Sequence, residues 1–375
     1  MKNQNIVFVG FRGAGKSRFG KEIAKLTHLP FVDLDTELEF VLGTDIESFA
    51  EKHGWQVLRE IEQKVAHDFT RNFSGIVATG HATIENSKNL HNLKKTGVFG
   101  NLKPNFMQLR RHLMKEYREN DIPRVYPDLG IAQEIDQLWS QRKDIYAATA
   151  DFELVPDLDN DNAEEEAQKM LEQISKDIIP DAAPKRRVAV FSSSNGTTFQ
   201  GLLEAQKKGR IPNVEFVLFI TDKPNCGALE KAQQAGIETI HVLEPEEDET
   251  REEYDRQLIN LIREQNPDVI LLAGWMRILS PLFCEQFGDT TLNVHPSLLP
   301  DYAGMMGDAI HKKVIENEDR YTGATIHKVS PEVDGGDIVV QRKVLVTETD
   351  SVEDLRRKVQ AQEVLGFCEA LEKKK

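Results

Sequence analysis

The segment Gly10-Phe11-Arg12-Gly13-Ala14-Gly15-Lys16-Ser17 decides the fold of the first half of the chain. It follows the apolar run Ile6–Val9 and precedes a helical pattern, and its glycines, Lys16 and Ser17 match the P-loop. Glycines let backbone N–H groups converge on phosphate oxygens, and the positive end of the following helix adds to the attraction. The segment therefore predicts a strand–loop–helix unit that holds a nucleotide phosphate.

Length, charge and cysteine content limit the classes of protein to consider. A chain of 375 residues is long for one domain and suits two. The formal net charge of −15 disfavours nucleic acid as a partner, and no apolar run reaches the ~20 residues of a membrane span. Three scattered cysteines form neither a zinc spacing nor a disulfide framework, so a cytoplasmic location is expected. The sequence does not indicate an oligomeric state.

A short Pro-containing segment divides the chain. Pro180 and Pro184 follow the last helical pattern of the first half, and a fresh apolar strand begins at Val188. We therefore expect one domain over residues 1–178, a linker over 179–186 and a second domain over 187–375. Both halves alternate short apolar runs with helical patterns, which is typical of parallel α/β sheets. The expected fold is a P-loop kinase-type parallel sheet followed by a Rossmann-like, doubly wound sheet. Expected strands of the second half are 188–191, 216–221, 239–242 and 269–273.

Two acidic residues follow the helix after the P-loop. If Asp33 and Asp35 stood on one strand, their side chains would point the same way, toward a metal ion and a substrate hydroxyl. Further segments lie downstream: Arg59-Glu60-Ile61-Glu62, Thr79-Gly80, Arg124 and Arg142-Lys143-Asp144-Ile145-Tyr146.

On these segments, residues 1–175 resemble the shikimate kinase family. The resemblance implies that ATP and Mg²⁺ are used and that a small hydroxylated carboxylate is phosphorylated. The implied ATP-binding residues are Gly13, Ala14, Gly15, Lys16, Ser17 and Arg124. The metal would be held by Ser17 and, through water, by Asp33, and the acceptor by Asp35, Arg59, Gly80 and Arg142.

The acceptor side departs from the family pattern. The family's glycine triplet is Gly80-His81-Ala82 here, and Val125-Tyr126 follow Arg124 where Pro and Leu are usual. Two alternatives to shikimate phosphorylation therefore stay open. The domain could phosphorylate another small hydroxylated acceptor, or it could be a non-catalytic nucleotide-binding module.

The second half carries an amide, an imidazole and a carboxylate that suit acyl transfer to an amine. Alternation along a strand places Asn293 and His295 on one face, at the carboxyl end where parallel sheets bind ligands. Asp334 follows in the glycine turn Val333-Asp334-Gly335-Gly336. Asn293 can donate to an oxyanion and His295 can move a proton. Direct attack by a substrate amine is the simpler mechanism, because no well-placed Ser or Cys nucleophile accompanies them.

Residues 187–375 resemble the glycinamide ribonucleotide formyltransferase family along the whole domain. The resemblance implies 10-formyltetrahydrofolate as cosubstrate, purine biosynthesis as the pathway, and Asn293, His295 and Asp334 as catalytic residues. The implied ribonucleotide-binding residues are Gly196, Thr197, Thr198, Gln360 and Glu363. The implied folate-binding residues are Arg251, Met276, Arg277, Ile278, Leu279 and Asn293. The expected partners of the whole chain are therefore small molecules: glycinamide ribonucleotide, 10-formyltetrahydrofolate, ATP and a shikimate-like acceptor.

Overall fold

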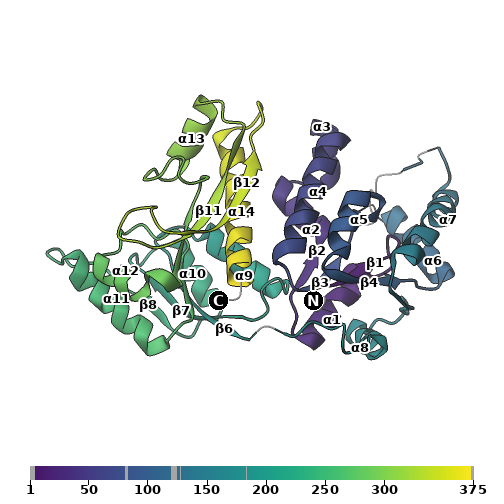
Figure 1. The fold of residues 1–375 in the computed structure, drawn as a ribbon, viewed down its shortest axis with the longest axis horizontal. Coiled ribbons are helices and arrows are strands. Elements are labelled where there is room, and N and C mark those ends of the chain that lie inside the picture. Colours follow the sequence, from purple (N-terminus) through teal and green to yellow (C-terminus); the bar gives the residue numbers. More distant parts are fainter. Residues whose placement is uncertain (1–4, 81–82, 120–124, 127, 183, 373–375) are drawn as a thin grey trace. The chain divides into compact units, whose positions relative to one another are not determined.

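The structure is a computed structural model that describes residues 5–80, 83–119, 125–126, 128–182 and 184–372 (Figure 1). The chain divides into two compact units, residues 1–183 and 184–375. Each unit is built on one β-sheet. The residues assigned to the linker partly belong to these units, because Ile179 packs against the first core and strand β6 already begins at Arg186.

The first unit is an all-parallel five-stranded sheet with helices between its strands. The strand order is β2-β3-β1-β4-β5. Its strands are β1 (Asn5–Val9), β2 (Phe31–Asp33), β3 (Gly75–Ala78), β4 (Gly97–Leu102) and β5 (Phe152–Leu154). Its helices are α1 (Lys16–Thr27), α2 (Leu34–Leu42), α3 (Ile46–His53), α4 (Trp55–Asn72), α5 (Ser87–Lys94), α6 (Phe106–Glu119), α7 (Ile131–Thr149) and α8 (Ala163–Gln173).

The apolar strand that precedes the P-loop lies in the middle of this sheet. Residues Ile6 to Val9 of β1 are fully buried, since β3 pairs on one side and β4 on the other. Three P-loop glycines have positive φ values, 147° at Gly10, 75° at Gly13 and 89° at Gly15. A side chain would be strained at these values, so the loop needs glycine at all three positions. Gly15 is also the N-cap of α1, as the motif predicts.

The second unit is a seven-stranded sheet of mixed direction. The strand order is β12-β11-β10-β9-β6-β7-β8, with β10, β9, β6, β7 and β8 parallel and β10, β11 and β12 antiparallel. Its strands are β6 (Arg186–Phe191), β7 (Val214–Thr221), β8 (Ile240–Val242), β9 (Val269–Leu272), β10 (Thr291–His295), β11 (Tyr321–Lys328) and β12 (Ile338–Leu345). Its helices are α9 (Thr197–Lys207), α10 (Gly227–Gln234), α11 (Arg251–Gln265), α12 (Pro281–Phe287), α13 (Asp308–Glu316) and α14 (Val352–Glu372).

The expectation of two α/β sheets is confirmed. The four strands expected from apolar runs in the second unit are present as β6, β7, β8 and β9. The antiparallel hairpin of β11 and β12 was not among them. It extends the parallel sheet beyond β10, and α14 packs against it and against α9. Among the described residues, no helix combines the length and the apolar character needed to cross a bilayer.

Each unit has its own hydrophobic core, which leads to a prediction about folding. Buried residues of the first core lie between Ile6 and Ile174, and those of the second unit's clusters between Ala189 and Val359. A chain shortened to residues 184–375 should therefore fold and unfold in one cooperative transition. Circular dichroism during thermal unfolding measures this. An insoluble product, or a melt without a sigmoidal transition, would show that the second unit depends on the first.

Candidate functional site

A cavity of about 750 Å³ lies at the carboxyl end of the parallel strands of the second unit. The loops that follow β6, β9 and β10 all contribute to its wall, as does one face of α14. Loops meet at this edge because the strands are parallel, and open α/β sheets bind ligands there. Asn293, His295 and Asp334 all line the cavity. Of the residues expected for the ribonucleotide, Thr197, Thr198, Gln360 and Glu363 line it too, and Gly196 does not.

His295 lies between two hydrogen-bond acceptors. Its Nδ1 is 3.3 Å from Asp334 Oδ2, and its Nε2 is 3.1 Å from the Tyr302 carbonyl oxygen. Burial lowers the pKa of His295 below its ordinary value, although Asp334 and the Tyr302 carbonyl oppose that shift. A neutral imidazole donates from one nitrogen only, and a carboxylate is the stronger acceptor. The arrangement therefore favours a proton on Nδ1, a basic Nε2 and a carbonyl ready to accept from Nε2 once it is protonated.

A second histidine, His327, orients the Asn293 amide. The two residues are directly opposite each other in the antiparallel pairing of β10 with β11. His327 Nδ1 is 2.8 Å from the Lys328 carbonyl oxygen, so Nδ1 donates and Nε2 is left to accept. Asn293 Nδ2 is 3.1 Å from that Nε2 and donates to it. One N–H of the amide is thus fixed, and the other remains for a ligand in the cavity.

Asp334 joins these groups through a tight glycine turn. Its backbone has φ 57°, and its carboxylate also accepts from Gly304 N at 2.8 Å and lies 3.6 Å from His327 Nε2. A Cβ at Gly336 would lie 1.8 Å from the Lys328 carbonyl oxygen. Glycine there lets the turn pack onto the end of β11, and this contact brings the carboxylate to both histidines.

The loop between β6 and α9 forms another wall. Gly196, with φ 70°, is the N-cap of α9, and a Cβ there would lie 2.7 Å from Ala228. The first N–H groups of a helix have no partner within the helix, so this N-terminus suits an anion. Beside it, the Thr198 hydroxyl donates to the buried carboxylate of Glu363. Burial raises the pKa of Glu363 to about 7, and the bond from Thr198 only partly offsets this.

The segment expected to bind the folate lines the same cavity. Met276 and Ile278 are 48% and 50% exposed, so they offer apolar surface to a ligand. The Arg277 guanidinium lies 4.0 Å from the centre of the Tyr254 ring. Arg251 is exposed at the first position of α11 and is not among the described residues that line the cavity. Its assignment to the folate stays a prediction.

In the first unit, Lys16 is buried within the P-loop. Its Nζ donates to the carbonyl oxygens of Gly10 at 2.9 Å and Phe11 at 3.0 Å. Burial lowers the pKa of Lys16 to about 8, against the opposing effect of Asp35 and Asp33. The P-loop carbonyl oxygens therefore hold the Lys16 ammonium group inside the loop that would surround a nucleotide phosphate.

The expectation that Asp33 and Asp35 share one strand is wrong. Strand β2 ends at Asp33, and Asp35 lies in the first turn of α2. Asp33 caps this helix by accepting from Asp35 N at 3.0 Å and Thr36 N at 3.3 Å. Asp33 also accepts from the Ser17 hydroxyl. In the described part of the chain no three His, Cys, Asp or Glu side chains could hold a metal by themselves. The Ser17–Asp33 pair nevertheless suits Mg²⁺, which usually completes its coordination with water and substrate phosphates.

The expected acceptor residues are only partly brought together. Asp35 shares a small pocket with Glu62 and Thr83, and a Cβ at Gly80 would lie 2.1 Å from Asp35 Oδ1. Burial, with help from Asp33, raises the pKa of Asp35 to about 6. Arg59 joins this group through an ion pair with Glu62 at 2.7 Å.

The remaining expected residues lie elsewhere or outside the described residues. Arg142, on α7, lines a different small pocket with Phe11 and Arg12. Arg124, His81 and Ala82 lie outside the described residues.

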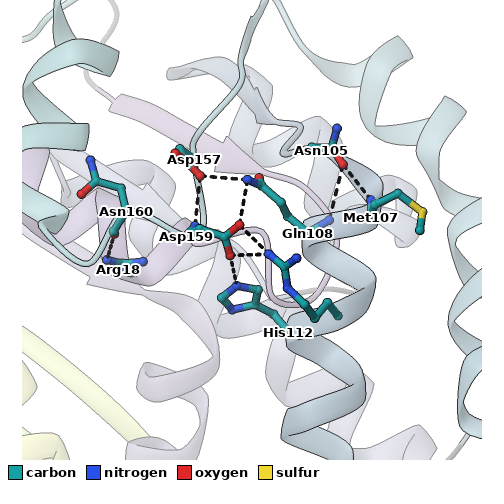
Figure 2. A network of polar contacts seen from close by, with 9 residues as sticks. Arg18, Asn105, Met107, Gln108, His112, Asp157, Asp159 and Asn160 are labelled. Atoms are coloured by element: carbon teal, nitrogen blue, oxygen red, sulfur yellow. Dashed lines mark hydrogen bonds and ion pairs between the residues drawn. The ribbon is translucent and has the colours of Figure 1, made fainter.

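A polar network ties α6 to the loop that follows β5 (Figure 2). Asp159 accepts from Arg111 and lies 2.9 Å from His112 Nε2, and Gln108 bridges Asp157 and Asp159. Arg111 first, and then His112, hold the pKa of Asp159 down at about 2. Nearby, Arg18 of α1 donates to the Asn160 carbonyl oxygen at 2.5 Å. The loop is thus fixed between α6 and the helix that follows the P-loop.

The second unit, which contains the cavity, matches a known protein family. The family model described as Formyl transferase matches residues 186–371. Phosphoribosylglycinamide formyltransferase of Escherichia coli (strain K12) is 42% identical over 176 residues, which are 47% of this chain and 81% of that protein. The chain belongs to the phosphoribosylglycinamide formyltransferase family.

This formyltransferase relationship concerns one half of the chain. The trifunctional purine biosynthetic protein adenosine-3 of Gallus gallus is 38% identical over 188 residues, which are 50% of this chain but 18% of that protein. Among solved structures, glycinamide ribonucleotide transformylase 1 of Symbiobacterium toebii is 34% identical and covers 50% of this chain and 86% of its own, with a TM-score of 0.46. For the other half, the family model described as Shikimate kinase matches residues 12–175.

Sequence reasoning about this formyltransferase missed two cavity residues. His327 stands opposite Asn293 only because of the register between β10 and β11, which the sequence does not reveal. Arg356 lines the cavity from α14, one turn before Gln360. The helical spacing of residues 356, 360 and 363 is a signal that could have identified it.

Glu363 should make the stability of this formyltransferase fall as pH rises. Because burial raises its folded pKa from 4.5 to about 7, the folded chain holds this proton more tightly than the unfolded chain. Stability is therefore lost between about pH 4.5 and pH 7, by about 3 kcal/mol. Glu363→Gln should remove that loss, so its melting temperature should exceed wild type more at pH 8 than at pH 5.

Glu353→Gln is the matched control for this prediction, since Glu353 lies on the same helix with a side chain that is 84% exposed. Its melting temperature should differ from wild type equally at both pH values. The assignment is contradicted if Glu363→Gln shows the same constant difference.

Proposed function

We propose that the second unit transfers the formyl group of 10-formyltetrahydrofolate to the amine of glycinamide ribonucleotide, a step of purine biosynthesis. The observation that carries the proposal is the Asn293–His295–Asp334 arrangement at the wall of the cavity. The family assignment supports it, because the E. coli relative is named for this activity. The α9 N-terminus offers a place for the ribose phosphate, and Met276 and Ile278 offer apolar surface for the folate.

The reaction begins when the substrate amine attacks the formyl carbon and forms the new C–N bond. The formyl oxygen becomes an oxyanion and accepts from the N–H of Asn293 that His327 leaves unused. The amine proton passes to His295 Nε2, which then donates to the Tyr302 carbonyl oxygen. Asp334, 3.3 Å from Nδ1, stabilises the imidazolium that results.

The tetrahedral intermediate collapses when the bond between the formyl carbon and N10 of the folate breaks. His295 returns its proton to N10, so tetrahydrofolate leaves and the formyl group stays on the glycinamide nitrogen. Atoms and protons balance without ATP. The reaction also needs no covalent enzyme intermediate, and the cysteines of the chain, all buried, take no part.

For the first unit, we propose ATP-dependent phosphorylation of a small hydroxylated carboxylate, with Mg²⁺ near Ser17 and Asp33. The P-loop geometry and the match to the shikimate kinase family support nucleotide binding. Asp35, whose pKa is raised to about 6, would orient the attacking hydroxyl, and Arg59 would bind the carboxylate. We expect weak turnover of shikimate itself, because the family's three glycines leave more room for the substrate ring than Gly80-His81-Ala82 does.

His295→Ala should lower formyl transfer by roughly 10²–10⁴ in kcat, the range for losing a general base. Asn293→Ala should cost on the order of 10²–10³. Both should still bind glycinamide ribonucleotide, because the phosphate is held at α9. Turnover by rapid-mixing assay and binding by calorimetry measure the two effects. His241→Ala, in β8, is the control, and wild-type turnover in His295→Ala would exclude the proposed mechanism.

Lys16→Ala should weaken binding of Mg²⁺–ATP by more than about tenfold, because the buried ammonium group neutralises phosphate charge. Lys25→Ala is the control, since Lys25 is exposed on the same helix. Calorimetry measures binding, and ADP release with and without shikimate measures turnover. ATP binding with little shikimate-dependent ADP release is the expected wild-type result. Rapid shikimate-dependent release would contradict the weak-turnover proposal, and a lack of ATP binding would contradict the nucleotide site.

A further inference from the structure

Arg356 stands out among the residues of the formyltransferase cavity. Of the described side chains that line the cavity, the arginines are Arg277 and Arg356, while Glu332, Asp334 and Glu363 are acidic. Arg277 is stacked on Tyr254. A phosphate monoester that enters this cavity meets the carboxylates of Glu332 and Asp334, so it needs a nearby cation in addition to backbone N–H groups.

Helix α14 places Arg356 beside the end of α9. The two helices run in the same direction: Thr198 donates to Glu363, a Cβ at Gly201 would touch Val364, and Arg210, just after α9, pairs with Glu372. Position 356 lies seven residues before Glu363, which is about 10 Å along a helix. This part of α14 therefore extends past the N-terminus of α9, alongside the space that an anion bound there occupies.

Arg356 shares one helix face with Gln360 and Glu363, and all three line the cavity. Arg356 forms ion pairs with two exposed carboxylates. Its guanidinium lies 3.2 Å from Asp308 and 3.4 Å from Glu353, whose side chains are 46% and 84% exposed. Exposed ion pairs contribute little to stability, so a bound dianion can replace them. A guanidinium also suits phosphate because it can donate two parallel hydrogen bonds.

We propose that Arg356 binds the phosphate of the ribonucleotide substrate and so determines its affinity for the formyltransferase site. This inference rests on the proposed formyl transfer. Folate carries carboxylates that could also pair with an arginine. The phosphate is the better assignment because Arg356 lies on the α14 face that contacts the α9 loop, whereas the Met276–Leu279 segment comes from the loop after β9.

Arg356→Gln tests the proposal in the full-length chain. It should raise KM for glycinamide ribonucleotide by roughly 10- to 100-fold, as expected for losing a charge-assisted bond. KM for 10-formyltetrahydrofolate and kcat should change by less than about twofold. Glycinamide riboside, which lacks the phosphate, should react equally well with wild type and Arg356→Gln. Arg357→Gln is the matched control, because Arg357 is exposed on the same helix and pairs with Asp354.

Three results would overturn the assignment. A raised KM for the folate alone would place the folate carboxylates at Arg356. An equal loss with the riboside would show that Arg356 does not act on the phosphate. Asp308→Asn frees Arg356 of one partner and should leave KM for the ribonucleotide unchanged or lower. If Asp308→Asn instead raises KM for the ribonucleotide as Arg356→Gln does, the role of Arg356 is only to hold the start of α13 through Asp308.

A binding measurement separates this inference from the proposed function and does not depend on turnover. Ribose 5-phosphate should bind wild type and Arg357→Gln with equal affinity by calorimetry, and Arg356→Gln roughly tenfold or more weakly. Equal binding to all three proteins would exclude Arg356 as the phosphate ligand even if formyl transfer is observed. If Arg356→Gln binds ribose 5-phosphate more weakly but the wild type does not transfer formyl groups, the phosphate site is retained and the proposed reaction is rejected. Arg356→Lys, which keeps the charge, should recover part of the affinity if Arg356→Gln does not fold.

Discussion

The carboxylate of Asp334 is the contact on which the formyltransferase site depends. It lies 3.3 Å from His295 Nδ1 and 3.6 Å from His327 Nε2, and it accepts from Gly304 N at 2.8 Å. In the proposed mechanism it is the counterion for the charge that the buried imidazole gains during proton transfer, and burial already lowers the pKa of His295. The same carboxylate fixes the loop before α13. One side chain therefore contacts both histidines and the loop that follows β10.

The sheet explains how distant parts of the sequence meet at this carboxylate. Strand β10 is parallel to β9 on one side and antiparallel to β11 on the other. The parallel side places the end of β10 next to the ligand loops after β6 and β9. The antiparallel side returns the chain through β11, so that His327 is opposite Asn293 and the turn with Asp334 follows at once. The hairpin thus supplies the groups that orient Asn293 and His295, which both belong to β10.

Local patterns in the sequence predicted both sheets and several residues that line the cavity, Asn293, His295 and Asp334 among them. Apolar runs identified the central strands, and strand alternation placed Asn293 and His295 on one face. Contacts that depend on register or on chain reversal were not predictable: His327 was missed because β11 was not expected. Asp35 was misplaced because the capping of α2 by Asp33 ends the strand earlier than alternation suggests. Arg356 was overlooked since its place at the cavity depends on how α14 extends past α9.

Formation of product by the purified full-length chain tests the central claim most directly. With glycinamide ribonucleotide and 10-formyltetrahydrofolate, and without ATP, the account predicts equal amounts of tetrahydrofolate and formylglycinamide ribonucleotide, with no covalent formyl-enzyme detected by mass spectrometry. Transfer that requires ATP, tetrahydrofolate released without formylated product, or a formyl group trapped on the protein would contradict direct attack by the substrate amine at the Asn293–His295–Asp334 site.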